Sequence, residues 1–219
     1  MDLVDIDRGK LPPEEHKAAE TVKLNLIHIQ IAAQDFRHTV ELYLFAHDRK
    51  LAGEDNSRRM IAWMKLAGRS GAILAYSIHR VMQAINAVNA PTLRALVNMK
   101  ERNQATSLFD AEFPNIAGIR TSAAHPGELT DTENKLANHR LKKAMVSGLG
   151  YFGAGSYIVD GMNAYGDHLI FSASFDGKPA QYELSMKKAD VLDKVTRHYC
   201  RAFYPLEGAT AALQRERMR

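Results

Sequence analysis

The sequence predicts a mainly α-helical fold: an antiparallel helical bundle, then a small antiparallel β-hairpin or meander, then a final helix. Apolar residues recur at helical spacing through most of residues 12–125. After residue 146 glycines become frequent and the apolar period drops to two, which is typical of strands. We therefore expect a single domain over 1–219. Its expected parts are a bundle at 12–125, a polar loop at 126–146, a β insertion at 147–185 and a last helix at 186–204.

The first helix is expected to begin at Pro12 and Pro13, which a helix tolerates in its first turn, and to run to about Ala52. Gly53 is its expected stop. Its apolar residues form two stripes: Val22, Leu26, Ile29, Ala33, Phe36, Val40 and Tyr43, and then Leu24, Ile27, Ile31, Leu42 and Phe45. A helix with so wide an apolar surface is expected to be buried on several sides, in a bundle core or a dimer interface.

A second long helix is expected to be capped by Asp55 or Asn56 and to end near Ala90. Within it Gly68 and Gly71 would permit a bend or a close helix contact. Two shorter helical segments are expected near 92–98 and 102–113. A further short helix is predicted from Pro114, in its first turn, to the Pro126-Gly127 pair that ends it.

The β insertion is predicted to contain strands at 156–159 and 168–175. Asp176-Gly177 is a typical two-residue hairpin turn. Pro179 would place the returning strand at a sheet edge, because proline cannot donate to the ladder. Ser185 is expected to cap the last helix.

Composition limits the class of protein. The net charge of +4 and pI near 9.1 permit anionic partners. A single cysteine, Cys200, excludes an internal disulfide and a cysteine-based zinc site and fits a reducing compartment. The first residues lack the pattern of a signal peptide, and no apolar run approaches the roughly 20 residues that cross a bilayer. We expect a cytoplasmic protein without a membrane segment.

Two motifs suggest a cofactor or a metal but lack the required context. The dinucleotide-binding motif G-x-G-x-x-G is matched by Gly148, Gly150 and Gly153. That motif must connect a strand to a helix, whereas these glycines lead into strands. Positions in turns and at strand ends explain them better. His28, Asp35 and His38 lie along the first helix without a second close ligand pair, and we favour a buried polar contact within the bundle. No cofactor and no metal are expected.

Arg120 and His125, on the short helix after Pro114, are the candidate chemical groups. Metal-free RNA cleavage requires a base for the 2′-hydroxyl, an acid for the leaving oxygen and a cation for the charged phosphorane. Histidine transfers protons near neutral pH, and arginine offers a planar fork of donors that matches phosphate oxygens. Five residues apart on a helix, the two side chains differ by about 140° and about 7.5 Å of rise. A two-fold dimer would bring two copies of each into one cleft.

The bundle, followed by the segment I-R-T-S-A-A-H-P-G-E-L, resembles the HEPN family (higher eukaryotes and prokaryotes nucleotide-binding) over roughly residues 12–130. The resemblance implies a dimeric, metal-independent RNA endonuclease in a toxin–antitoxin or phage-defence system, with an antitoxin or nucleotidyltransferase as a further partner. Arg120 would be the phosphate ligand and His125 the general acid/base, with Thr121 and Glu128 as supporting groups. Family members often carry Asn, Asp or His where this chain has Thr121. A basic run would lead in the RNA backbone: Lys135, Arg140, Lys142 and Lys143.

A non-catalytic interpretation stands beside this one. Arg120 could pair with Glu128 or Glu112 to hold its helix in place, and His125 could cap the carbonyls at the helix end. The chain would then be a HEPN-like helical module that binds a nucleotide or a protein partner.

Overall fold

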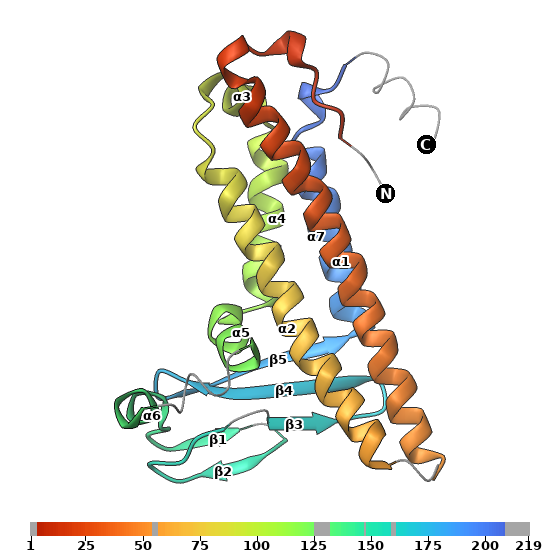
Figure 1. Cartoon of the computed structure of the whole chain (residues 1–219), viewed down its shortest axis with the longest axis vertical. Helices are drawn as coiled ribbons and strands as arrows, with labels where there is room; N and C mark the ends of the chain where they lie inside the picture. Colours follow the sequence, from red (N-terminus) through yellow and green to blue (C-terminus); the bar gives the residue numbers. More distant parts are fainter. Residues whose placement is uncertain (1–3, 54–56, 125–131, 147, 159–160, 209–219) are drawn as a thin grey trace. The chain divides into compact units, whose positions relative to one another are not determined.

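The computed structural model describes residues 4–53, 57–124, 132–146, 148–158 and 161–208 (Figure 1). In these residues the chain is mainly helical, with seven α-helices and two small antiparallel sheets, as the sequence predicts. The chain divides into two compact units that alternate along the sequence. The helical unit is Met1–Ala33, Ser77–Glu112 and Asp190–Arg219, and the mixed unit is Gln34–Tyr76 and Phe113–Ala189. Both long helices contribute to both units.

Helix α1 (His16–Leu51) follows a 3-10 turn at Pro13–Glu15 and ends before Gly53, whose φ of 72° only glycine adopts easily. The start and the stop of this helix are confirmed. The first apolar stripe, from Val22 to Tyr43, is buried throughout. The second is not, because Leu24, Ile31 and Phe45 are 56%, 42% and 48% exposed. A bundle core is therefore the wrong interpretation of the second stripe, and a dimer interface stays a prediction.

The helical unit is completed by three helices: α3 (Pro91–Leu96), α4 (Met99–Glu112) and most of α7 (Met186–Arg201). Buried Glu15 accepts from the backbone N–H groups of Thr92 and Leu93, both at 2.9 Å, and so caps the N-terminus of α3. Ser185 caps α7 through Lys188 N at 3.2 Å, as predicted. None of the described helices combines the length and the apolar character that a membrane span requires.

Helix α2 (Ser57–Ala87) packs on a sheet at its two glycines, both in the mixed unit. A Cβ at Gly68 would lie 2.8 Å from Phe171, and one at Gly71 would lie 2.6 Å from the Tyr182 hydroxyl. The close contact that these glycines allow is therefore with strands rather than with a helix. Tyr182 donates to the Gly68 carbonyl, and burial raises the pKa of this tyrosine, so its hydroxyl stays protonated. The expected caps at Asp55 and Asn56 lie outside the described residues.

The sheet has the order β3 (Gly161–Ala164), β4 (His168–Phe175), β5 (Lys178–Ser185), antiparallel throughout. Strand β4 has the predicted bounds, and Asp176 and Gly177 form the predicted turn with φ of 49° and 72°. Pro179 lies in β5, an edge strand of this sheet, as expected. One face of β4 and β5 is expected to carry seven alternating apolar side chains. Phe175 is half-buried, and the other six are buried: Leu169, Phe171, Ala173, Ala180, Tyr182 and Leu184.

Three local predictions are wrong. The expected polar loop contains α6 (Glu133–His139) and β1 (Ala144–Val146), because the helix is too short and polar to show an apolar stripe. Residues 156–158 form no strand, because the Ile158 N–H donates to the Ser174 hydroxyl rather than to a backbone carbonyl; β1 pairs instead with β2 (Gly150–Phe152). Pro114 precedes its helix rather than opening it, because Asn115 has a φ of 61° that separates the two helices.

Candidate functional site

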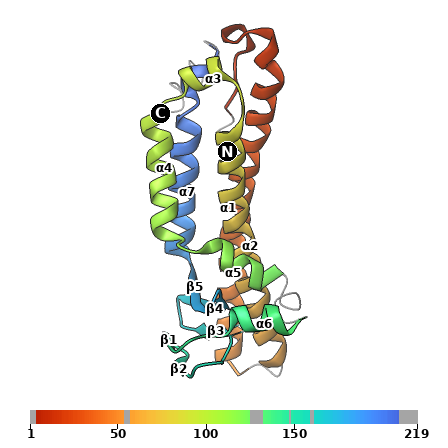
Figure 2. The ribbon, with the colours of Figure 1, turned by 90° about the vertical axis from the view of Figure 1, so that its left-hand side faces the viewer.

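Helix α5 (Ile116–Ala124) carries the candidate arginine and packs against β4 and β5 (Figure 2). Its buried face explains this position: Ile116, Gly118, Ile119, Ser122 and Ala123. Gly118 permits the close approach, since a Cβ there would lie 2.8 Å from the Phe175 ring. The opposite face of α5 is more exposed and includes Ala117, Arg120 and Thr121. The helix thus presents Arg120 and Thr121 on its less buried side, while the Ser122 side chain is buried.

The Arg120 side chain is partly buried and lies over an aromatic ring. Its guanidinium carbon is 5.3 Å from the centre of the Tyr76 ring on α2, within the mixed unit. Such a cation–π contact orients the guanidinium while leaving its N–H groups free to donate. Within the part of the chain that the structure describes, no ion pair involves Arg120. The arrangement fits a cation that is held ready for an anion.

Thr121 uses its hydroxyl proton within its own helix. Its Oγ1 donates to the Ala117 carbonyl at 3.0 Å, one turn back. This common helical bond leaves the oxygen with lone pairs that can still accept a hydrogen bond. Thr121 therefore offers a hydrogen-bond acceptor next to Arg120. In this arrangement its hydroxyl proton is engaged with Ala117 and takes no part in proton transfer.

Several predicted site residues cannot be placed. His125 and Glu128 lie outside the described residues, as does the side chain of Lys135 in α6. Arg140, Lys142 and Lys143 are exposed on the segment between α6 and β1. They belong to the same unit as Arg120. Glu112, one of the two expected partners of Arg120, belongs to the helical unit.

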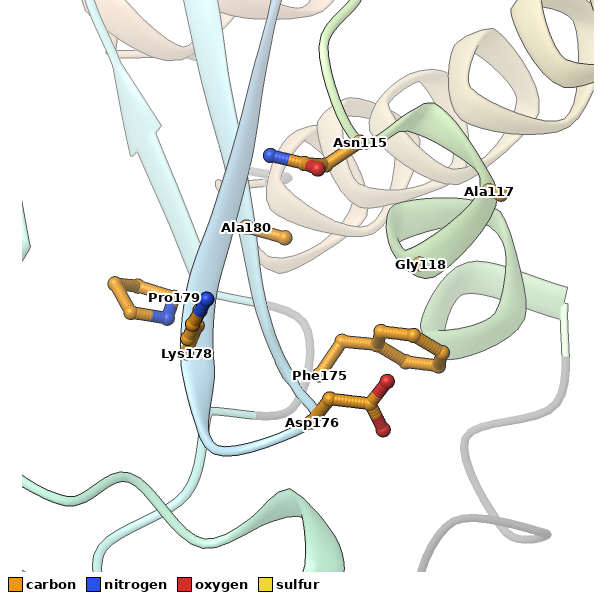
Figure 3. Close-up of a pocket in the computed structure, with 8 residues that line it drawn as sticks. All are labelled: Asn115, Ala117, Gly118, Phe175, Asp176, Lys178, Pro179 and Ala180. Carbon is orange, nitrogen blue, oxygen red and sulfur yellow. The ribbon is translucent and has the colours of Figure 1, made fainter.

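A pocket of about 360 Å³ lies between the start of α5 and the β4–β5 turn (Figure 3). Its polar lining residues are Asn115, Asp176 and Lys178, and its apolar ones are Ala117, Gly118, Phe175, Pro179 and Ala180. The Phe175 ring and the Asp176 carboxylate point toward α5 in Figure 3. This volume is at the lower end of the range for small-molecule pockets. Arg120 and Thr121 follow Ala117 by one helical turn, on the same side of α5.

Sequence reasoning missed one histidine at this place. His139, the last residue of α6, packs on Phe175 with ring centres 5.2 Å apart and accepts at Nδ1 from the Asp176 backbone N–H at 3.2 Å. In the neutral ring this bond places the proton on Nε2. The signal in the sequence was weak, since only its position directly before the basic residues Arg140, Lys142 and Lys143 distinguished it.

The metal and cofactor motifs have ordinary structural explanations. Among the described residues no group of three histidine, cysteine or carboxylate side chains could hold a metal. His28, Asp35 and His38 are exposed, so the buried polar contact that we favoured is wrong; His38 lies 3.8 Å from Asp35 on the surface of α1. Gly148 and Gly150 lie in a turn and at a strand start, and Gly153 directly follows β2, as expected.

No family model matches the sequence, and no curated protein or solved structure matches it significantly.

Proposed function

We propose that this chain is a metal-independent RNA endonuclease of the HEPN type that acts as a dimer, with Arg120 and His125 in a shared cleft. The observation that carries the proposal is the state of Arg120. Its guanidinium lies 5.3 Å over the Tyr76 ring, and no carboxylate in the described ranges forms an ion pair with it. An arginine held in this way is suited to a phosphate oxygen, because its planar fork of donors matches the geometry of phosphate oxygens.

In the proposed reaction the RNA 2′-oxygen attacks the neighbouring phosphorus, and the bond from phosphorus to the 5′-oxygen breaks. A base takes the 2′-hydroxyl proton, and an acid supplies a proton to the leaving 5′-oxygen. The products are a 2′,3′-cyclic phosphate and a 5′-hydroxyl. His125 from each chain would supply the two proton-transfer groups, and Arg120 would stabilise the charge that develops on the phosphorane.

The test is incubation of the purified chain with mixed RNA in EDTA, followed by analysis of the RNA ends. We expect wild type to leave 2′,3′-cyclic phosphates, and Arg120→Ala and His125→Ala each to lose about 100-fold or more in rate. Arg59→Ala, an exposed arginine on α2, is the matched control and should cleave like wild type. Equal inactivity of wild type and His125→Ala on every RNA offered would remove the enzyme proposal.

The shared cleft has its own test. Inactive Arg120→Ala and His125→Ala chains are mixed, unfolded and refolded together, so that mixed dimers form. A mixed dimer retains one arginine and one histidine from different chains and lacks one of the two proton-transfer groups, so its cleavage is expected to exceed that of either variant alone but to stay well below wild type. Sedimentation of the wild-type chain as a monomer at assay concentration would contradict this part of the proposal.

The pocket beside α5 favours a second candidate, a HEPN-like module that binds a nucleotide without cleaving RNA. Its volume of about 360 Å³ and its three polar lining residues suit a ligand of that size. Calorimetric titration with mononucleotides tests it, with Lys178→Ala as the variant, since Lys178 is an exposed cation that lines the pocket. Binding that Lys178→Ala abolishes, in a chain that cleaves no RNA, would favour this candidate over the first.

A further inference from the structure

Strands β1 and β2 form a two-stranded antiparallel ribbon, which has one buried face and one face that is exposed to solvent. Figures 1 and 2 both show the two strands side by side. The inner face is closed by a small apolar cluster that contains Val146, Leu141 and Ile158, each 5% exposed or less. On the outer face Met145 lies directly opposite Tyr151 in the strand register. These two side chains are 74% and 63% exposed.

The ribbon belongs to a segment of the chain that contains basic residues and no acidic ones. Residues 134–159 contain four basic residues, Lys135, Arg140, Lys142 and Lys143, and no aspartate or glutamate. The whole chain has 29 basic and 25 acidic residues, so the remaining residues have 25 of each and no net charge. The segment itself therefore has a net charge of +4. Its partner is expected to be an anion.

A second exposed tyrosine lies near the basic residues. The Leu141 N–H donates to the Ser156 carbonyl at 2.7 Å, which places the backbone of Tyr157 beside that of Arg140. The Tyr157 side chain is 48% exposed. The segment therefore combines exposed aromatic rings with exposed cations, and Arg140, Lys142 and Lys143 are all at the surface.

Exposed tyrosines among lysines and arginines favour a nucleic acid over other anionic partners. Bases stack on aromatic rings whatever their sequence, while cations contact the phosphates. A membrane surface would instead require a broad aliphatic face, and Met145 is the one aliphatic side chain exposed on these two described strands. Stacking needs unpaired bases, because an A-form duplex hides the base faces.

We propose that the outer face of the β1–β2 ribbon binds single-stranded RNA, with Tyr151 and Tyr157 stacking on bases and Arg140, Lys142 and Lys143 contacting phosphates. The choice of RNA rests on the proposed function. The new element is that the RNA substrate is single-stranded where it binds. The ribbon would hold the strand while Arg120 and His125 supply the reacting groups.

The test separates binding from cleavage. The probe is a fluorescein-labelled 2′-O-methyl oligouridylate of about 20 nucleotides, a length that covers several stacking sites. Its 2′-oxygens have no proton and cannot attack phosphorus, so the wild-type chain can be used. Affinity is measured by fluorescence anisotropy in EDTA over a series of salt concentrations.

Tyr151→Leu is expected to weaken binding about 10-fold, because it removes one stacking platform, whereas Tyr151→Phe keeps the ring and should bind like wild type. Lys142→Ala/Lys143→Ala should reduce the slope of log affinity against log salt by about 1.4, the loss of two phosphate contacts to a single strand. Arg58→Ala/Arg59→Ala, an exposed basic pair on α2, is the matched control and should leave that slope unchanged. Thermal unfolding of each variant verifies that the fold is intact.

Wild-type affinity in both Tyr151→Leu and the double lysine variant would overturn the inference. It is also overturned if these variants lose binding to phosphatidylserine vesicles while RNA binding is unchanged. Ribbon-dependent binding by a chain that cleaves no RNA would support the inference and contradict the proposed function. RNA cleavage that is unchanged in the ribbon variants would support the proposed function and contradict the inference about the ribbon.

Discussion

In the helical unit, several polar side chains in or near the core have partners inside the unit, whereas the exposed tyrosines among the described residues lie in the mixed unit. Glu15 caps α3, His198 lies 2.6 Å from Glu101, and the Tyr199 hydroxyl lies 3.0 Å from the Met82 carbonyl. In the mixed unit Tyr151 is 63% exposed, and Arg140 and Lys142 are exposed as well. The exposed tyrosines therefore distinguish the surface of the mixed unit from that of the helical unit.

This difference indicates where function lies. Polar groups that satisfy one another in a core stabilise a fold and are unavailable to a ligand. The pocket, Arg120 and the β1–β2 ribbon all lie in the mixed unit. We expect substitutions in the helical unit to change stability alone, and substitutions on the surface of the mixed unit to change binding or activity alone.

The largest expected effect tests whether the two units unfold independently of each other. Phe171 is fully buried between β4 and Gly68 of α2, and Phe171→Ala should lower the free energy of unfolding by about 3–5 kcal/mol. Native-state hydrogen exchange should show lost protection first in α5, β4 and β5. Phe109→Ala in α4, at a side chain that is 1% exposed, is the matched change in the helical unit. Equal loss at every amide from either variant would mean that the chain unfolds as one unit.

A smaller effect is expected at Tyr199, which is fully buried in the helical unit. Its hydroxyl lies within hydrogen-bond distance of Met82 O and Asn86 Oδ1, and burial raises its pKa, so it remains a donor. Tyr199→Phe should cost about 1–2 kcal/mol in urea denaturation, because a buried acceptor loses its donor. Tyr151→Phe removes the same atom from an exposed ring and should cost nothing measurable. Similar losses in both would break the contrast between the units.

The smallest effect is a pH dependence at Glu15. Burial raises the pKa of this carboxyl, but hydrogen bonds from the Leu93 and Thr92 N–H groups outweigh burial and hold the pKa below its usual value. A lowered pKa in the folded state stabilises the fold above the unfolded-state pKa, and this stabilisation is lost as pH falls through the folded-state value. Glu15→Gln should therefore be less stable than wild type at pH 7, with a gap that narrows below about pH 4. Thermal unfolding of both proteins from pH 7 to pH 3 measures this difference in stability. A difference that increases at acidic pH would contradict the account.

Strongly periodic elements were predictable because their signals are local. The first stripe of α1, the alternation of β4 with β5 and the Asp176-Gly177 turn each depend on neighbours a few residues apart. Short polar elements were not predictable. Helix α6 has no apolar stripe, and β1 pairs with β2 while residues 156–158, part of an expected strand, form none. Strands of three residues form here because they cover an apolar cluster, and that cluster includes Ile158 from outside both strands.

The candidate site shows the same limit. The sequence singled out Arg120 from its spacing to His125, but its contact with Tyr76 joins residues 44 positions apart. His139 has no motif, and only the fold packs it on Phe175 beside the pocket. The second stripe of α1 has the composition of a buried face, and only the packing leaves Leu24 more than half exposed.

By itself, the sequence determined the mainly helical class, the bounds of α1 and β4, the hairpin turn and the basic character of residues 134–159. These follow from periodicity, backbone preference and charge, which act over a few residues. The tertiary structure decided which apolar stripes are covered, what lies over Gly68 and Gly71, and which polar groups meet at α5. Those outcomes depend on burial and on contacts between distant segments, and no local pattern specifies them.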